Sequence, residues 1–361
     1  MAWRSDLIDR RSFMKAAGIG FAAVLSPRSL MALERSDAVY ASGFRAPDGS
    51  FGIATVSERG EIIDRTALPA RSHGMAFSPS AGRLVAFARR PGTFAMATDP
   101  FGKAAPVIIS APEGRHFYGH GAFSPDGRLL YASENDFDGN RGMIGVYDAV
   151  ERFDRIGEFD AQGIGTHDMA VSDDGSMLVV ANGGIETHPD FGRTKLNLDR
   201  MEPSLVLLDA RDGSVIQRHS LPTSLRQLST RHIAVGDAGQ VWFACQWEGA
   251  RNVSPPLVGH LARGSDIRFV ALPEETTSGL ANYVGAIAVN RQEGVVGLTS
   301  PKGGMAVNLD SRTGAVLGTE KIRDAAGVAP AAHGMAVSAY DGRFNDTRSA
   351  VAWDQHIIRL G

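Results

Sequence analysis

The chain has 361 residues, of which 43% are hydrophobic and 21% are charged, so it is long enough to bury a large core. Its net charge of −3 gives no reason to expect nucleic acid or an anionic membrane as a partner. It has one cysteine, Cys245, and no CxxC pair, which excludes a disulfide within the chain, covalently attached haem and cysteine-based zinc sites.

The N-terminus has the pattern of a twin-arginine export signal. The segment Asp9–Lys15 contains two adjacent arginines, a phenylalanine and a lysine, and an apolar stretch of small residues follows it to about Ala32. The most apolar part, Ala16–Leu25, is too short for a stable transmembrane helix. We therefore expect residues 1–32 to be a signal peptide and residues 36–361 to be a single, monomeric periplasmic domain that does not insert into the membrane. A short amphipathic anchor is the alternative.

Six segments of the chain share one short pattern, in which a histidine usually precedes apolar residues. They are Ser72–Pro79, Gly119–Gly127, Thr166–Ser172, Arg231–Val235, Val284–Val289 and Ala332–Ser338. The matching positions lie 47, 47, 65, 53 and 48 residues apart, and five of the six are histidine, with Gly285 as the exception. A repeat of this length is typical of a propeller or a solenoid.

Each segment is followed by short runs of β-forming residues bounded by glycine or aspartate turns. In the second repeat these runs are Leu129–Ser133, Met143–Tyr147 and Arg155–Phe159. Four antiparallel strands per repeat form a propeller blade, and no helical periodicity occurs beyond the export signal. The N-terminal runs from Ala38 to Thr66 and the strands after His333 should complete one another. We therefore predict an all-β protein, a β-propeller of four-stranded blades, seven in number with six as the alternative, closed by the N- and C-terminal strands.

The unusual residues fall in two sets of loops that share one face of such a propeller. The loops that enter the inner strands carry the histidines. The loops between second and third strands carry charged insertions, the longest of which covers residues 182–197. The other face has plain turns such as Asp173–Gly175. Because function concentrates on loops held by a rigid scaffold, we expect the first face to bind a ligand.

Histidines are the first group of candidates on this face. The repeat histidines are His73, His120, His167, His232 and His333, and His116 and His188 lie near them. Pseudo-rotation would bring the repeat histidines to the mouth of one channel, where converging neutral imidazoles suit copper, iron or zinc. The alternative is that each imidazole hydrogen-bonds within its own blade. Gly285 favours a functional role for the histidines, because a purely structural device should recur in every blade.

Charged and polar residues form the second group. The candidates for binding an anion or another ligand are Arg89, Arg90, Arg115, Glu134, Asp136, Asp190, Arg193, Lys195, Arg231, Gln246 and Lys302. Guanidinium groups suit carboxylate or phosphate, whereas the alternative is that these arginines pair with acidic neighbours such as Glu186. Glu134 and Asp136 could also act as paired carboxylates or as calcium ligands, although the spacing of an EF-hand is absent.

Enzymatic chemistry has no motif to support it. The sequence contains no nucleophile elbow, P-loop, Rossmann fingerprint or HExxH motif. A binding protein is therefore the favoured class, and an enzyme is kept as an alternative.

Several long and unusual strings carry a family resemblance. They are Arg89–Gly92, Arg115–Gly121, Glu134–Asp136, Gly145–Asp148, Ala181–Asp190, Lys195–Leu198, Arg231–His232 and Ser300–Gly304. In these strings the chain resembles the DUF1513 family of twin-arginine-exported proteins, and the repeats are also similar to YVTN- and WD40-like propeller repeats. The resemblance implies a periplasmic β-propeller, commonly encoded beside imelysin-like and dihaem peroxidase-like proteins in a setting linked to iron acquisition. The family has no established activity.

Three hypotheses about function follow. The first is a non-enzymatic periplasmic protein whose histidine- and arginine-rich face binds a transition metal, iron or copper, or an anionic metal complex, during metal acquisition. The second is a scaffold that docks an imelysin-like or haem-protein partner. The third is a lactonase-like hydrolase with a divalent metal held by Glu134 and Asp136.

Overall fold

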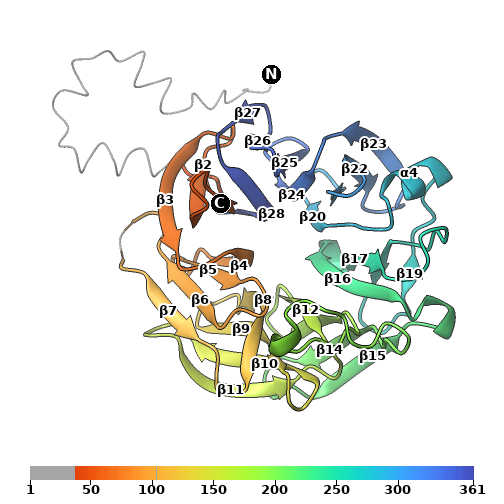
Figure 1. Ribbon diagram of the computed structural model, residues 1–361, viewed down its shortest axis with the longest axis horizontal. Helices are drawn as coiled ribbons and strands as arrows, with labels where there is room; N and C mark the ends of the chain where they lie inside the picture. Colours follow the sequence, from red (N-terminus) through yellow and green to blue (C-terminus); the bar gives the residue numbers. More distant parts are fainter. Residues whose placement is uncertain (1–36, 103) are drawn as a thin grey trace, which may run out of the picture.

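Seven sheets, each of four antiparallel strands, surround a central axis (Figure 1). The computed structural model describes residues 37–102 and 104–361, so the predicted signal peptide, residues 1–32, lies outside the described residues. The predicted β-propeller with seven blades is confirmed, and the alternative of six blades is wrong. Within the described residues, no helix combines the length and the apolar character that crossing a bilayer requires.

The four strands of each blade are arranged side by side from the axis outward. The innermost strands are β28 (Ala352–Arg359), β4 (Ser72–Ser78), β8 (Arg115–Phe123), β12 (Thr166–Val171), β16 (Leu228–Val235), β20 (Ala286–Asn290) and β24 (Ala325–Pro330). The second strands are β1 (Tyr40–Arg45), β5 (Arg83–Ala88), β9 (Leu129–Asp136), β13 (Met177–Asn182), β17 (Val241–Trp247), β21 (Val295–Ser300) and β25 (Met335–Ala339).

The remaining elements form the outside of the ring. The third strands are β2 (Phe51–Val56), β6 (Phe94–Thr98), β10 (Arg141–Asp148), β14 (Ser204–Asp209), β18 (Val258–Leu261), β22 (Met305–Asp310) and β26 (Arg343–Phe344). The outermost strands are β3 (Ile62–Leu68), β7 (Val107–Ser110), β11 (Asp154–Asp160), β15 (Val215–Ser220), β19 (Arg268–Phe269), β23 (Val316–Lys321) and β27 (Thr347–Arg348). The short helices of the described part are η1 (Pro189–Phe191), η2 (Thr223–Leu225), η3 (Asp237–Gly239) and α4 (Glu274–Gly279).

The two ends of the described chain close the ring together, as predicted. The C-terminal strand β28 pairs antiparallel with β1, so one blade combines one C-terminal strand with three N-terminal strands. In Figure 1 this joint is where the blue and red ends of the colour scale meet. Closure pairs the inner edge of β1, which would otherwise be open to aggregation.

Burial within a blade follows the distance from the axis. Every residue of the second strand β13 is buried, because it is covered by neighbouring blades on both faces. The outermost strand β11 instead alternates exposed and half-buried residues, as expected for a strand with one face in solvent. The blades pack on one another through aromatic contacts such as Phe87 with Phe117, whose ring centroids are 6.0 Å apart. The result is a rigid ring that holds the inner strands, and the side chains on them, around one axis.

Candidate functional site

Five histidines from five of the seven inner strands converge in the central channel. We call His73, His120, His167, His232 and His356 the histidine cluster; they come from β4, β8, β12, β16 and β28. The ring centroids of His73 and His120 are 4.8 Å apart, and those of His232 and His356 are 4.7 Å apart. The ring of His167 lies 4.9 Å from that of His232. Residues up to 283 positions apart in the chain therefore share one small volume.

Irregular strand pairing turns these side chains toward the channel. The register with the second strand shifts at each histidine: between Ser72 and Met75 on β4, and between Phe117 and Gly121 on β8. Corresponding shifts occur on β12, on β16 and where β28 pairs with β1. A bulge of this kind re-aims a side chain, and bulges are frequent beside functional sites.

Two glycines allow the imidazoles to pack closely. Gly119 has φ +110°, which a side chain disfavours, and a Cβ atom there would lie 2.8 Å from Cδ2 of His73. A Cβ atom on Gly74 would lie 2.5 Å from Nδ1 of His120. Both positions thus exclude any larger residue for the same reason, which is contact with a ring of the cluster.

The cluster contains buried nitrogen atoms that have no hydrogen-bond partner among the described residues. They are Nδ1 of His73, Nε2 of His120, Nε2 of His167, both ring nitrogens of His232, and Nε2 of His356. A buried polar atom without a partner is costly, and native proteins satisfy nearly all of them. Converging unsatisfied imidazole nitrogens are therefore the signature expected of a site whose missing partner is a ligand.

Burial in the channel favours the neutral form of His73, His167 and His232. Burial, followed by the neighbouring imidazoles and arginines, lowers the pKa of His73 and of His167 well below the ordinary value. Burial likewise lowers the pKa of His232 to about 4, although the carboxylate of Asp168 opposes this effect. Neutral imidazole is the form that coordinates metals.

One carboxylate, Asp168 on β12, supports the cluster from behind. Its Oδ1 lies 3.2 Å from Nδ1 of His120, and its Oδ2 lies 3.8 Å from Nδ1 of His232. The carboxylate also accepts backbone N–H bonds from Met169 and Ile233, at 2.8 and 3.0 Å. Contacts with His120 and His232 hold the pKa of Asp168 far below its usual range despite burial. The side chain is therefore a charged acceptor that orients imidazoles from two neighbouring blades.

Two sets of three histidines have the spacing of a metal site. Ligand atoms of His73, His120 and His356 all lie within 4.8 Å of one another, and so do those of His120, His167 and His232. An ion about 2.1 Å from each nitrogen needs nitrogen–nitrogen separations of up to about 4.2 Å, so small rotations of the rings would close either set. Imidazole ligands of this kind suit copper, iron, nickel or zinc.

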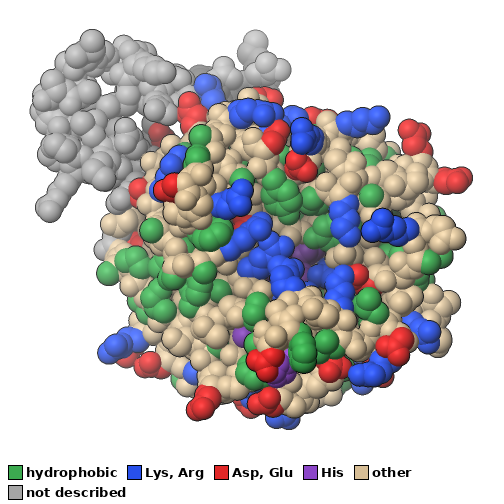
Figure 2. Space-filling view, viewed as in Figure 1, with side chains coloured by type: hydrophobic (Ala, Val, Ile, Leu, Met, Phe, Trp, Pro, Cys, Tyr) green, Lys and Arg blue, Asp and Glu red, His purple; other side chains and the backbone are tan. Residues whose placement is uncertain are grey.

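A cavity of about 320 Å³ opens onto the cluster from the loop-rich face. We call it the cationic cavity because Arg89, Arg90, Arg193, Lys195, Arg231 and Lys302 line it, and the predicted residue Gln246 lines it too. His73 and His167 belong to the same lining, so the cavity reaches the cluster. Figure 2 shows Lys and Arg side chains gathered over the central depression, with histidine visible between them.

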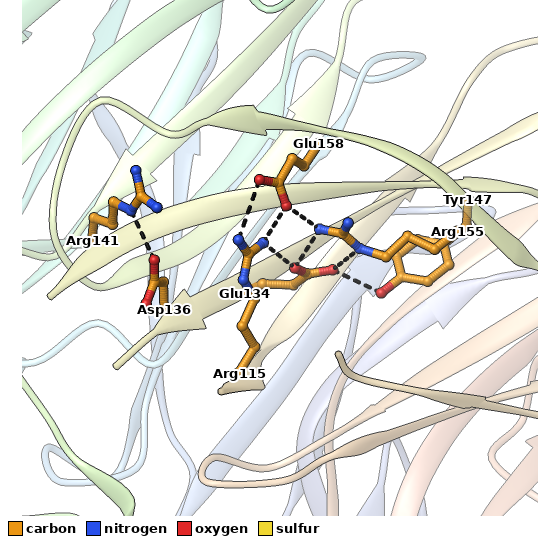
Figure 3. Close-up of polar contacts among 7 residues, drawn as sticks. All are labelled: Arg115, Glu134, Asp136, Arg141, Tyr147, Arg155 and Glu158. Carbon is orange, nitrogen blue, oxygen red and sulfur yellow. Dashed lines mark hydrogen bonds and ion pairs between the residues drawn. The ribbon is translucent and has the colours of Figure 1, made fainter. Parts of the chain in front are cut away.

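The carboxylates predicted for this face lie elsewhere. Glu134 is fully buried inside its own blade, where Arg115, Arg155 and Tyr147 bind it at 3.0, 3.0 and 2.7 Å (Figure 3). Asp136 accepts from Nε of Arg141 at 2.8 Å. The prediction of Glu134 and Asp136 as paired carboxylates or calcium ligands is thereby corrected, as is that of Arg115 as an anion ligand, because their charges already compensate one another.

The other predicted histidines of the second repeat and of the long insertion are also separate from the cluster. His116 is buried with both ring nitrogens satisfied, by the carbonyl of Phe117 at 2.9 Å and the amide of Asn135 at 3.1 Å. His188 caps η1 by accepting from the backbone N–H of Asp190, and it lies 3.6 Å from that carboxylate. His116 therefore has no free lone pair for a metal, and Asp190 serves the loop that it belongs to.

His356, and not the predicted His333, lies in the channel. The inner strand of its blade is β24, and His333 sits in the turn to β25, 95% exposed and 3.3 Å from Glu293. The predicted place of His333 in the ring is therefore wrong: the segment Ala332–Ser338 leads into a second strand, not an inner one. Second strands have the same alternating apolar pattern as inner strands, so the repeat was matched one strand too late.

The sequence interpretation missed several residues of the site. They are His356, Asp168, Gln355, Tyr118, Tyr283 and Tyr340. A usable signal existed for two of them: Gln355-His356-Ile357 repeats the histidine-before-apolar pattern, and Asp168 directly follows a repeat histidine. The tyrosines carry no such signal, because only the folded ring brings them to the cavity.

Comparisons with known proteins agree with the fold. The model of a family described as "Protein of unknown function (DUF1513)" matches residues 66–360. A curated protein from Pseudomonas aeruginosa, "Dihydro-heme d1 dehydrogenase", is 34% identical over 110 residues, which are 30% of this chain and only 17% of that protein.

Among solved structures, Kuenenia stuttgartiensis hydrazine synthase matches with a TM-score of 0.59 and 13% identity, over 86% of this chain and 90% of that one. The β-propeller domain of Myceliophteria thermophila Cps50 (Swd1) matches with a TM-score of 0.59 and 11% identity, over 84% of this chain and 90% of that one. Both structural likenesses show the fold alone.

Proposed function

The chain belongs to the DUF1513 family of proteins of unknown function, and we propose that it binds a transition metal ion, iron or copper, through its histidine cluster. The observation that carries this proposal is the set of buried imidazole nitrogens without hydrogen-bond partners, on histidines that form two overlapping triads in the channel. An ion bound by either triad of histidines would give several of these nitrogens a partner, and the ring of blades would keep the ligands in place without it.

The metal ligands in this proposal are imidazoles alone. The imidazoles supply neutral nitrogen donors, and the contact of Asp168 with His120 leaves Nε2 of that ring directed away from the carboxylate. The single cysteine is not a ligand in this scheme, because Cys245 is buried in the core on β17. A nitrogen-only set suits copper and iron as it suits zinc and nickel, and the family resemblance is what favours iron or copper here.

The compartment and the biological role are part of the proposal. The twin arginines in residues 1–32 support export to the periplasm, and metal acquisition is the role that the family resemblance suggests there. Imelysin-like or dihaem peroxidase-like proteins stay predicted partners for that role.

The test is reconstitution of protein purified in its folded, exported form. After chelation, it is loaded with Fe, Cu or Zn, desalted, and analysed for metal content by mass spectrometry. We expect close to one ion per chain for iron or copper, and loss of that ion in the double variant His120→Ala/His167→Ala. The control His333→Ala removes an exposed imidazole outside the cluster and should retain the metal. Equal metal content in the double variant and the control would refute the proposal.

A second candidate function is binding of a carboxylated tetrapyrrole. It is supported by the name of the partial relative, dihydro-heme d1 dehydrogenase, and by the combination of imidazoles with arginines that suit carboxylates. Titration with haemin tests it: a shifted Soret band that disappears in His73→Ala, whose imidazole lines the cavity, would favour it over a free ion. An unshifted band would exclude it.

A further inference from the structure

The cationic cavity has an excess of positive charge that the surrounding protein does not neutralise. Six of its lining residues are Lys or Arg, and none of the lining residues is Asp or Glu. Lys195 and Arg231 share one carboxylate, that of Glu248, which lies 3.0 Å from Arg231. The other four cations have no carboxylate within 4.0 Å among residues 37–102 and 104–361: Arg89, Arg90, Arg193 and Lys302.

The arginines of the cavity also keep free donors. Nε of Arg89 and Nε of Arg231 are buried without a hydrogen-bond partner in the described structure. Burial, then repulsion from Arg89 and Arg90, lowers the pKa of Arg193 to about 10, although that side chain still reaches solvent. Like charges held this close together destabilise a protein unless an anion binds between them.

Size and neutral donors narrow the class of anion. A cavity of about 320 Å³ lies at the small end of the range of ligand pockets, roughly 300–1,000 Å³, which suits a small organic acid. The tyrosines Tyr118, Tyr283 and Tyr340 add hydroxyl groups to the lining, and Gln246 and Gln355 add amides. An anion with several negative charges would offset the four unpaired cations better than a monovalent one.

We infer that the cationic cavity binds a small polyanion of the tricarboxylate class, and that its oxygen atoms complete the coordination of an ion held by the histidine cluster. The second half rests on the proposed function; the first half does not. Guanidinium forks bind carboxylates in pairs of parallel hydrogen bonds, and the cavity supplies three of them beside two lysines and the buried Arg231. His73 and His167 belong both to the cavity lining and to the histidine cluster, so an anion in the cavity would lie next to an ion held by the cluster.

Calorimetric titration at fixed ionic strength tests the inference on the full mature protein. Citrate, pyrophosphate and sulfate are each titrated into metal-free protein, and citrate is then titrated into metal-loaded protein whose metal content is measured afterwards. The variant Arg89→Gln removes an unpaired cation from the cavity. Arg200→Gln is the matched control, because Arg200 lies on the same long loop as Arg193 but pairs with Glu186 outside the lining.

We expect citrate to bind metal-free protein at least about 100-fold more tightly than sulfate. Arg89→Gln should weaken citrate at least about tenfold, as expected for loss of a charge-assisted hydrogen bond, and Arg200→Gln should not. Metal loading should strengthen citrate binding by about fivefold or more. Equal affinities for citrate and sulfate, or equal effects of the two variants, would overturn the cavity assignment, and tighter binding of pyrophosphate would overturn the carboxylate class.

Failures of the two proposals are distinguishable. Citrate binding by a protein that takes up no metal would leave the polyanion site standing while refuting the metal proposal and the coupling. Metal uptake without citrate binding would refute only the inference about the cavity.

Discussion

Oδ1 of Asp168 lies 3.2 Å from Nδ1 of His120, close enough to decide which nitrogen of that imidazole carries the proton. With the proton on Nδ1, facing the carboxylate, the lone pair is on Nε2, which is buried and has no hydrogen-bond partner within the described structure. A carboxylate behind a metal-ligating histidine raises the basicity of the ligand and fixes its orientation. Asp168 is in this sense a positioning residue, and its contacts with β12 and β16 tie it to both blades.

Asp168→Asn should weaken metal binding about 10- to 100-fold, the range found when such supporting carboxylates are removed. The amide keeps one acceptor oxygen for a backbone N–H, so the fold should survive. The measurement is a competition titration of the metal against a chelator of known affinity, with thermal unfolding in parallel. Asp174→Asn, in an exposed turn where Asp174 accepts from Ser172 and Ser176, is the control. Equal metal affinities of the two variants would show that Asp168 has no positioning role.

Gly119→Ala should damage the cluster without touching any ligand. A Cβ atom there would lie 2.8 Å from Cδ2 of His73, and the φ of +110° adds backbone strain of about 1–3 kcal/mol. We expect lower stability together with weaker metal binding. Gly82→Ala is the control, since Gly82 also has a positive φ, +60°, but open space around its Cα atom. It should lose about 1 kcal/mol of stability and keep its metal affinity. Unchanged metal affinity in Gly119→Ala would mean that the close packing of the rings does not matter for binding.

The repeat spacing was enough to predict the fold because blade architecture leaves a regular mark on the sequence. Each blade alternates apolar residues over short strands, and a histidine lies on four of the seven inner strands at matching places in the repeat: His73, His120, His167 and His232. Those four rings lie together in the structure, and the cations from the loops between second and third strands lie over them.

Ring closure explains why the sequence interpretation missed His356. The inner strand β28 is the last in the chain, yet its three partner strands are the first, so His356 lacks the downstream strands that identify a repeat. Ion pairing explains the error about Glu134: its partners Arg115, Tyr147 and Arg155 come from β8, β10 and β11, and only the strand register brings them together. Ion pairing alone does not separate the two outcomes, because Arg115 pairs with Glu134 within its own blade whereas Lys195 and Arg231 line the cavity although both pair with Glu248.

The stability of the metal-free protein should rise with pH between about 4 and 6.5. The pKa of His232 is lowered to about 4 by burial, and the pKa values of His73, His167 and His356 are also lowered, whereas an unfolded chain titrates near 6.5. The unfolded state therefore binds more protons in this window, and stability is fully present above it and lost as the pH falls. Each imidazole that is neutral when folded contributes up to about 1.4 kcal/mol per pH unit.

Urea unfolding at several pH values measures this slope. His73→Asn should reduce it by up to one proton, while His333→Asn, which removes an imidazole that is 95% exposed, should leave it unchanged. Parallel slopes for the wild type and His73→Asn would contradict neutral burial of the cluster.

Glu134→Gln should destabilise the protein strongly and leave metal binding intact. Glu134 is fully buried and receives hydrogen bonds from Arg115, Arg155 and Tyr147, so the neutral amide would leave the two guanidinium groups with the partly exposed Glu158 as their one shared carboxylate (Figure 3). Breaking a buried ion pair from one side costs about 3–5 kcal/mol. Asp136→Asn, on the same strand β9, removes only the charge that pairs with the half-exposed Arg141 and should have a small effect. Denaturant unfolding and metal analysis of both variants check the contrast. If the folded Glu134→Gln variant loses the metal, Glu134 contributes to metal binding despite its ion pairs.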